Sequence, residues 1–452
     1  MPDKQNKMGI MPINKLIINM SLPMVISMLV LSLYNVVDSI FVSWISEEAL
    51  TAVSAAFPIQ NLMVAVATGT GVGLNALISK SLGEGNKKRA SDFAKNGLFL
   101  AACSSVVFII VGIFLVKPFF MSQTDDQLII TYGIEYSQIV TLFSFGLFGQ
   151  IVFERFCQAT GKTVYSMATQ IIGAVINLVL DPIFIFAFKM GVKGAAYATV
   201  LGQIVSVFVA FFLNKYKNRD IDISLKGFKP NFKLIKRIYA IGIPSIIMAS
   251  IGSVMYYGVN RILITMAKTA SAVFGVYFKL QSFIFMPIFG LNNGIIPIIG
   301  FNYGAGNRLR IMKTLKVGMV YSGAIMLVGT ILFQFFPHLF LGVFNASSDM
   351  LSMGVVALRV ASLCFIVAGV DIVIGSFFQA FGHGFASMIV SITRQLAVLL
   401  PSAYLLSLTG NVNMVWWAFP IAEGASLMAS LLFLRKIYKK TVRHIPDGVE
   451  IL

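Results

Sequence analysis

Long apolar stretches, separated by short polar breaks, recur along the whole chain. The stretch 96–116 runs for 21 residues without a charged side chain, 238–260 for 23 and 395–422 for 28. A helix needs about 20 mostly apolar residues to cross a bilayer. Polar segments such as 83–89 and 216–233 interrupt the pattern. The pattern therefore predicts an all-α membrane protein.

Twelve transmembrane helices follow from this pattern. Their expected ranges are 14–45, 50–80, 93–117, 128–160, 164–188, 192–214, 236–266, 271–302, 311–337, 349–381, 384–408 and 412–436. Several are close to 30 residues long, so we expect them to tilt or to extend beyond the hydrocarbon core.

Composition supports the same class and sets an orientation. Of the 452 residues, 57% are hydrophobic and only 12% are charged, which excludes an ordinary soluble or disordered protein. The net charge is +17. With a cytoplasmic N-terminus, 26 Lys and Arg lie in or beside cytoplasmic segments and 4 on the outer side. The positive-inside rule thus predicts cytoplasmic termini, and the basic excess faces anionic lipid instead of nucleic acid.

The chain has few of the residues that enzymes use for catalysis or for binding catalytic metals. The chain has three Cys and three His, which excludes a disulfide framework and a Cys-rich metal site. A membrane-embedded prenyltransferase would need paired aspartate motifs for Mg²⁺. The only adjacent Asp pair, Asp125 and Asp126, is followed by Gln-Leu-Ile in an expected outside loop. We therefore expect no enzyme activity.

The two halves of the chain match at a constant offset of 221 residues, without a gap from Pro23 to Gly161. The matching pairs include Pro23 and Pro244, Phe57 and Phe278, Gln60 and Gln281, Gly69 and Gly290, Gly73 and Gly294, Gly85 and Gly306, and Gln158 and Gln379. Six spans in each half make both halves enter from the same side, which predicts a parallel repeat. The expected parts are an N-lobe at 1–215, a basic cytoplasmic linker at 216–234, and a C-lobe with its cytoplasmic tail at 235–452.

Glycines at 69, 71 and 73 are only superficially like a nucleotide-binding loop. They lie inside an apolar span and lack the lysine of a P-loop. We expect them to permit close packing of helices.

Several motifs resemble one transporter family. They are VVDSIFVSWI at 36–45, NLVLDPIFIF at 177–186, GVKGAAYAT at 191–199 and the run 281–307 that ends in FNYGAGN. Together with the span count and the repeat, they resemble the multidrug and toxic compound extrusion (MATE) transporters, in the MepA-like branch. The resemblance implies a monomeric exporter of amphipathic, often cationic drugs in the cell membrane. It also implies antiport against Na⁺ or H⁺ by alternating access, with no other cofactor.

Five acidic residues lie deep inside the expected spans: Asp38, Glu154, Asp181, Asp371 and Glu423. An ionisable side chain at the centre of a bilayer costs roughly 2.5–3.5 kcal/mol on insertion scales. Each of the five is therefore a candidate functional residue.

Asp38 and Asp181 each have polar neighbours at helical spacing. Tyr34 and Asn35 precede Asp38 by four and three residues, and Asn177 precedes Asp181 by four.

Pro182 cannot donate a hydrogen bond to the carbonyl of Leu178, and Thr199 adds a hydroxyl early in the next span. Oxygen-rich groups of this kind suit Na⁺ or a proton. The resemblance implies that Asp38, Asn177, Asp181 and Thr199 match the family's N-lobe cation site. The alternative is that these groups only form hydrogen bonds between helices.

The other acidic residues leave alternatives open. Glu154, beside Arg155 and four residues before Gln158, fits a structural ion pair or a polar network in the N-lobe. Asp371 lies one turn from where some MATE branches place an essential acid. Those branches also carry an acid in span 7, and 243–264 has none, which argues against a cation site centred in the C-lobe.

Glu423 could pair with Arg394 of span 11. A lipid-linked saccharide flippase of the same superfamily is the alternative function, but it would need a cavity rich in Arg and Lys. Apart from residues at span ends, only five basic residues fall within the expected spans.

The orientation can be tested by labelling single cysteines in intact cells, after the three native cysteines have been replaced. Cysteines at Ser46 or Gln123 should react with an impermeant reagent from outside, and cysteines at Asn86 or Lys226 should not. Labelling at Asn86 from outside would reverse the orientation.

Overall fold

A computed structural model describes residues 6–344 and 347–448, and every regular element in these ranges is a helix. The first five residues of the expected N-lobe and the last four of the expected tail lie outside the described residues. Ten segments are long and apolar enough to cross a membrane. They are α2 (Ile13–Ser43), α3 (Glu47–Gly83), α4 (Lys87–Phe114), α8 with η1 (Thr163–Ala187), α9 (Val192–Lys217), α10 (Phe232–Met266), α11 (Lys268–Gly304), α12 (Arg308–Phe335), α16 to α17 with η2 (Gly384–Ser407), and α18 to α19 with η3 (Val412–His444).

Two further spans are bent pairs. Helices α6 (Gln127–Leu142) and α7 (Phe145–Ala159) meet at 46°, as do α14 (Ser348–Ser362) and α15 (Phe365–Ala380). Counted as one span each, they complete the predicted twelve. The short helix α1 (Lys7–Ile10) precedes the first span, and α5 (Val116–Met121) and α13 (Pro337–Gly342) lie between spans.

Repeat-related turns are built in the same way. Asn86 accepts a hydrogen bond from the backbone N of Arg89 at the start of α4, and Asn307 accepts one from Arg310 at the start of α12. These are ordinary N-caps, which satisfy backbone donors that the helix leaves free. Gly85 and Gly306 precede the caps with φ of +72° and +68°, a conformation that favours glycine.

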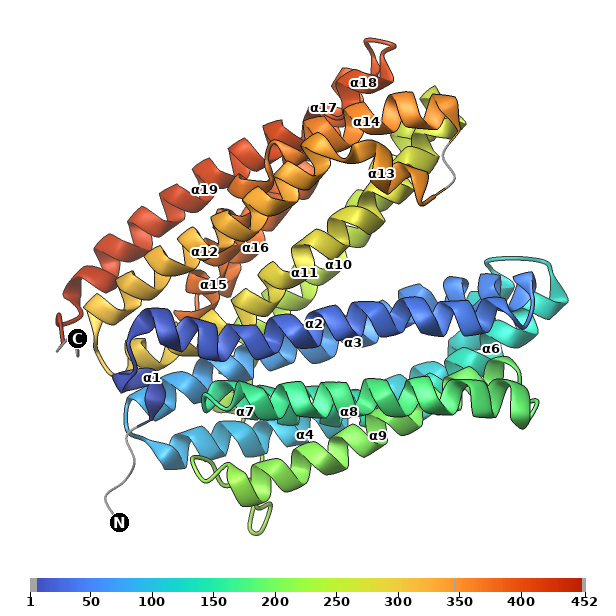
Figure 1. Cartoon of the computed structure of the whole chain (residues 1–452). Coiled ribbons are helices and arrows are strands. Elements are labelled where there is room, and N and C mark those ends of the chain that lie inside the picture. The colour runs from blue at the N-terminus through green and yellow to red at the C-terminus, as the bar shows by residue number, and fades with distance from the viewer. Residues whose placement is uncertain (1–5, 345–346, 449–452) are drawn as a thin grey trace. The chain divides into compact units, whose positions relative to one another are not determined.

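The chain forms two compact units. Unit 1 contains Asn6 and Ile26–Ile246, and unit 2 contains Lys7–Val25 and the chain from Ile247 onward. Within unit 1, α7, α8 and α9 run alongside one another, with α4 nearby (Figure 1). Within unit 2, α15 packs against α12 and α19 (Figure 1).

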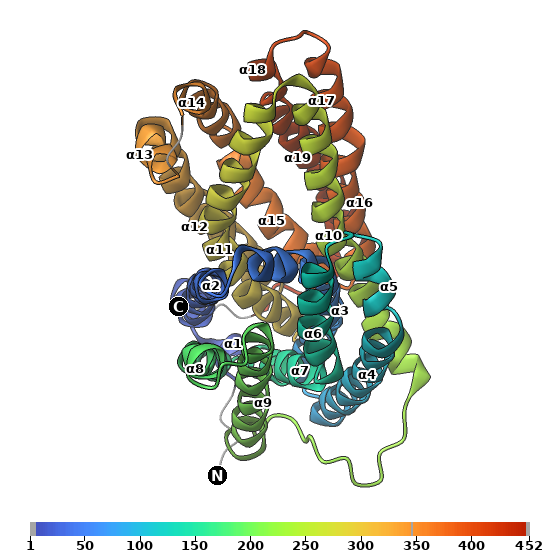
Figure 2. The same ribbon diagram turned by 90° about the vertical axis from the view of Figure 1, so that its right-hand side faces the viewer.

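The segment between α9 and α10 is held against unit 1. It runs from the end of α9 past the first turns of α4 (Figure 2). The Lys95 ammonium lies 2.9 Å from the Asp222 carboxylate, and the Asn231 backbone N donates to Asn96 Oδ1 across 2.9 Å. The basic segment is thus attached at several points along its length.

Glycines bring helix backbones into contact in both units. In unit 1, a Cβ at Gly69 of α3 would lie 2.9 Å from the backbone O of Gly242 in α10, and one at Gly73 would overlap the backbone O of Ile238. In unit 2, a Cβ at Gly290 of α11 would lie 2.6 Å from the backbone N of Val25 in α2. The predicted close packing is therefore present, and the repeat-related glycines make equivalent crossings.

Replacing Gly73 with alanine should destabilise the protein, because the new methyl group meets a backbone oxygen that cannot turn away. Overpacking of this kind costs about 1–3 kcal/mol. Gly375→Ala is the matched control, since a Cβ there meets nothing within 4 Å. Thermal unfolding of the purified proteins in detergent should show a lower midpoint for Gly73→Ala only. Equal midpoints would contradict the tight crossing.

Candidate functional site

The acids at 38 and 181 meet inside unit 1. Asp38 lies in the part of α2 that belongs to this unit, and Asp181 lies at the end of α8, fully buried. Their carboxyl groups are within hydrogen-bonding reach of each other. Asp38 Oδ1 is buried and finds no hydrogen-bond partner among the residues that the structure describes. Two acids 143 positions apart in the chain therefore form one site.

Asn177 joins Asp181 to α9. In the amide orientation that satisfies both of its polar atoms, Asn177 donates to Asp181 Oδ2 across 3.2 Å. Its oxygen accepts from Thr199 Oγ1 across 3.2 Å and from the Thr199 backbone N across 3.1 Å. The structure thus brings together the four residues that the resemblance assigns to the family's cation site, Asp38, Asn177, Asp181 and Thr199.

The chain changes its helical winding beside this site. Helix α8 ends at Pro182, and the next five residues, Ile183–Ala187, form the π-helical turn η1. Such turns are rare and occur frequently at functional sites. Pro182 has no N–H to donate to the carbonyl of Leu178, so the regular α-helical hydrogen-bond pattern cannot continue unchanged through this point.

Two phenols and one carboxamide complete the surroundings. Tyr34 lies close enough to Asp38 and Asp181 to interact with them electrostatically, and so does Tyr136 of α6. Gln60 Nε2 donates to the Tyr136 hydroxyl across 2.8 Å. Asn35, expected on the same face as Tyr34, is exposed instead.

Sequence reasoning missed Tyr136 and Gln60. Neither is charged, so the cost of burying an ionisable group did not single them out. Gln60 carried one signal, because its repeat partner is also glutamine, Gln281.

The arrangement can hold one small cation between oxygen atoms. It offers two carboxylates, a carboxamide and hydroxyl groups, which are ligands that Na⁺ accepts and among which a proton can bind. Among the described residues, no group of three or more His, Cys, Asp or Glu side chains is placed to hold a metal ion.

Glu154 belongs to a second polar network in unit 1. Its carboxylate accepts from Gln150 Nε2 across 2.9 Å and from Gln170 Nε2 across 2.7 Å. The neighbouring Arg155 donates to Gln158 Oε1 across 2.8 Å, and Gln158 donates to Ser166 Oγ across 2.9 Å. These contacts give Glu154 two hydrogen-bonded partners in unit 1, and both alternatives, a structural ion pair and a role in an N-lobe polar network, stay predictions.

The acids of unit 2 have protein partners. Asp371 is buried and accepts from the hydroxyl groups of Ser426, across 2.5 Å, and Ser430, both on α19. Glu423 forms the expected ion pair with Arg394, with 3.5 Å between Oε1 and Nη1. Arg394 lies in the π-helical turn η2 (Thr393–Leu399).

A family model matches the chain twice. The MatE model covers residues 23–183 and again 244–405, which is more than half of the chain and reproduces the internal repeat. The chain belongs to the MATE family.

Relatives agree over nearly the full length. The multidrug export protein MepA of Staphylococcus aureus strain MSSA476 is 26% identical, with 94% of each chain covered. MepA of Staphylococcus haemolyticus strain JCSC1435 is 28% identical over 90% of each chain. A solved outward-facing multidrug resistance MATE transporter of the MOP superfamily superposes with a TM-score of 0.92, at 26% identity, covering 98% of this chain and 99% of that one.

The protein is thus a multi-pass membrane transporter of the MATE multidrug efflux family and not an enzyme. It has the twelve-helix, two-lobe fold of that family. This matches the class expected from the apolar stretches and the repeat.

The Arg394–Glu423 pair should contribute to the stability of this MATE transporter. Arg394→Met leaves the partly buried Glu423 carboxylate without its cation, so we expect a loss of about 1–3 kcal/mol. Lys193→Met is the matched control, because the Lys193–Glu135 pair is more exposed and such pairs contribute about 0–1 kcal/mol. Unfolding midpoints in detergent measure both, and equal losses would contradict a structural role for Arg394.

Proposed function

We propose that this MATE transporter exports amphipathic, often cationic drugs in exchange for a cation that binds between Asp38 and Asp181. The observation that carries the proposal is the pair of carboxyl groups within hydrogen-bonding reach inside an apolar helical unit. A cation between two such groups offsets the cost of placing their charge away from water.

Coupling follows if the cation and the drug favour different conformations. A ligand shifts a conformational equilibrium only by the difference between its affinities for the two states. Asp38 and Asp181 lie on different helices, α2 and α8, so a cation that binds both favours the state in which these helices approach. Release of the cation removes that preference, and alternating access follows from the exchange.

The names of the relatives support the drug as the exported partner, since the staphylococcal proteins are multidrug export proteins. For the rest of the setting we propose a monomer in the cell membrane with cytoplasmic termini. The 26 to 4 distribution of Lys and Arg supports this orientation. The lobes at 1–215 and 235–452 stay a prediction.

Neutralising either acid should stop active efflux. Asp38→Asn and Asp181→Asn keep the side-chain shape and some hydrogen bonds, so expression and membrane insertion should remain. Each should abolish active efflux of ethidium, because no cation can drive the exchange. Ethidium should therefore accumulate in cells that express either variant. Asp125→Asn, in an exposed loop, is the control and should transport normally. Normal transport by both Asp38→Asn and Asp181→Asn would show the site to be wrong and make Asp371 the next candidate.

Variants that remove the uncharged oxygen ligands, those of Asn177 and Thr199, can show whether the coupling ion is Na⁺ or a proton. Na⁺ needs several oxygen ligands at once, whereas a proton needs only a carboxylate. We propose that Na⁺ takes part, because the Asn177 amide and the Thr199 hydroxyl adjoin the acids. Asn177→Ala and Thr199→Val should therefore weaken sodium-driven transport in proteoliposomes strongly. Full transport by both variants under a pH gradient without sodium would identify a proton site instead.

A further inference from the structure

Glu154 is a third acid in the apolar interior of unit 1, in addition to Asp38 and Asp181, and it has no role in the proposed cation exchange. Only 4% of its surface is exposed, and both carboxylate oxygens accept hydrogen bonds from glutamines. Glutamine at this position could make similar contacts without the cost of burying a charge. The two glutamine contacts alone therefore do not explain an acid here, and the adjacent buried Arg155 supplies one charge of opposite sign.

One face of α8 connects Glu154 with the site at Asp38 and Asp181. Gln170, Asn177 and Asp181 are separated by seven and four residues, so their side chains lie along the same face of the helix. Gln170 binds Glu154 at one end of this row, and Asp181 binds Asn177 near the other. At 1.5 Å per residue, the row is about 16 Å long.

Helix α9 carries a second row of polar side chains beside the row on α8. Thr199 contacts Asn177, and Gln203 follows Thr199 by one helical turn. The two helices approach closely here, because a Cβ at Gly202 would lie 2.7 Å from the backbone O of Gly173. Polar side chains of α8 and α9 thus line the same part of the unit.

Two oxygen atoms in these rows lack a protein donor. Gln170 Oε1 and Gln203 Oε1 are buried, and neither has a hydrogen-bond partner in the described part of the chain. A buried acceptor without a partner costs about 1–3 kcal/mol. Such atoms point to a ligand other than protein, either water or a passing cation.

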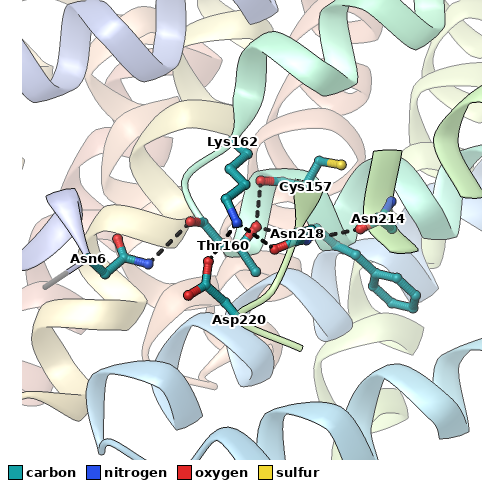
Figure 3. A network of polar contacts seen from close by, with 8 residues as sticks. Asn6, Cys157, Thr160, Lys162, Asn214, Asn218 and Asp220 are labelled. Atoms are coloured by element: carbon teal, nitrogen blue, oxygen red, sulfur yellow. Dashed lines mark hydrogen bonds and ion pairs between the residues drawn. The ribbon is translucent and has the colours of Figure 1, made fainter. Parts of the chain in front are cut away.

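Beyond Glu154, the polar contacts continue to the end of the unit. Arg155, Gln158 and Ser166 form the next layer. The turn between α7 and α8 follows, where Lys162 binds Asp220 across 2.8 Å and Asn218 across 3.0 Å (Figure 3). The positive-inside prediction places this turn at the cytoplasm.

We propose that Glu154 is a relay site for the coupling cation, between the Asp38–Asp181 site and the α7–α8 end of unit 1. The cation pauses at the Glu154 carboxylate and passes the oxygens of Gln170 and Gln203. These oxygens would coordinate Na⁺ directly, or would accept hydrogen bonds from the water that carries a proton. Glu154 is then a positioning and transfer residue, and the equilibrium binding site remains at Asp38 and Asp181. This inference rests on the proposed cation exchange.

The variant Glu154→Gln separates a relay from a structural contact. Its amide oxygen can still accept from one of the two glutamines, and its amide NH2 can donate to the other once that partner amide turns. In proteoliposomes, we expect the rate of ethidium transport to fall about tenfold. This is less than the loss expected when a group that transfers a proton in catalysis is removed. Ethidium affinity at equilibrium and the unfolding midpoint should stay unchanged. Glu154→Asp should restore part of the rate. Glu135→Gln, a half-exposed acid of the same unit, is the matched control and should transport normally.

The assay is run under a Na⁺ gradient at constant pH and under a pH gradient without sodium, so that each cation is tested alone. A rate equal to the wild type in both would overturn the relay. So would a loss of ethidium binding or of folding in Glu154→Gln, because the residue would then be structural. Running Asp38→Asn beside it keeps the two proposals apart. If Asp38→Asn is inactive and Glu154→Gln is normal, only the relay fails; if Asp38→Asn transports normally, the proposed exchange itself fails.

Discussion

Backbone contact at the glycine crossings is the constraint on which the rest of this structure depends. In a bilayer, helices gain little from burying apolar side chains against one another, so they associate through close van der Waals packing at small residues. Gly69 and Gly73 let α3 meet α10 in unit 1, and Gly290 and Gly294 let α11 meet α2 in unit 2. Because α2 and α10 each divide between the units, position along α2 decides the environment of a side chain. Asp38 lies past the division and therefore joins α8 and α9.

The repeat preserves this scaffold but not the polar groups that it positions. The residue 221 positions after Asp38 is Val259, which is buried in an apolar cluster of unit 2. Conversely, Asp371 corresponds to Gln150, which binds Glu154 in unit 1. Two units of the same design thus carry different chemistry. Unit 1 gathers acids on separate helices, whereas Asp371 of unit 2 is closed off by hydroxyl groups of α19.

Much of the fold could be predicted from the sequence, because the bilayer admits few alternatives. A spanning segment must satisfy its backbone hydrogen bonds internally, so long apolar stretches become helices. The expected span 164–188 and the observed Thr163–Ala187 differ by one residue at each end. The bends after Leu142 and Ser362 were not predicted, since no proline or glycine marks them and they depend on how the neighbouring helices pack.

The site was only partly predictable for a related reason. Asp38 and Asp181 stand out because a charge in an apolar span is costly, and helical spacing points to Asn177. Tyr136 and Gln60 do not stand out, because phenols and carboxamides are common enough in spans. Gln150 and Glu154 are four residues apart on α7, so spacing could have shown that contact, but Gln170 comes from α8 and its contact with Glu154 is tertiary.

The central claim is that a cation bound between Asp38 and Asp181 is exchanged for drug. Release of that cation when drug binds tests the claim most directly. Purified protein in weakly buffered detergent solution would be mixed with ethidium while proton-selective and sodium-selective electrodes record the solution. The wild type should release H⁺ or Na⁺ as ethidium binds, and Asp38→Asn and Asp181→Asn should release neither cation. Equal release from the wild type and both variants would contradict the account.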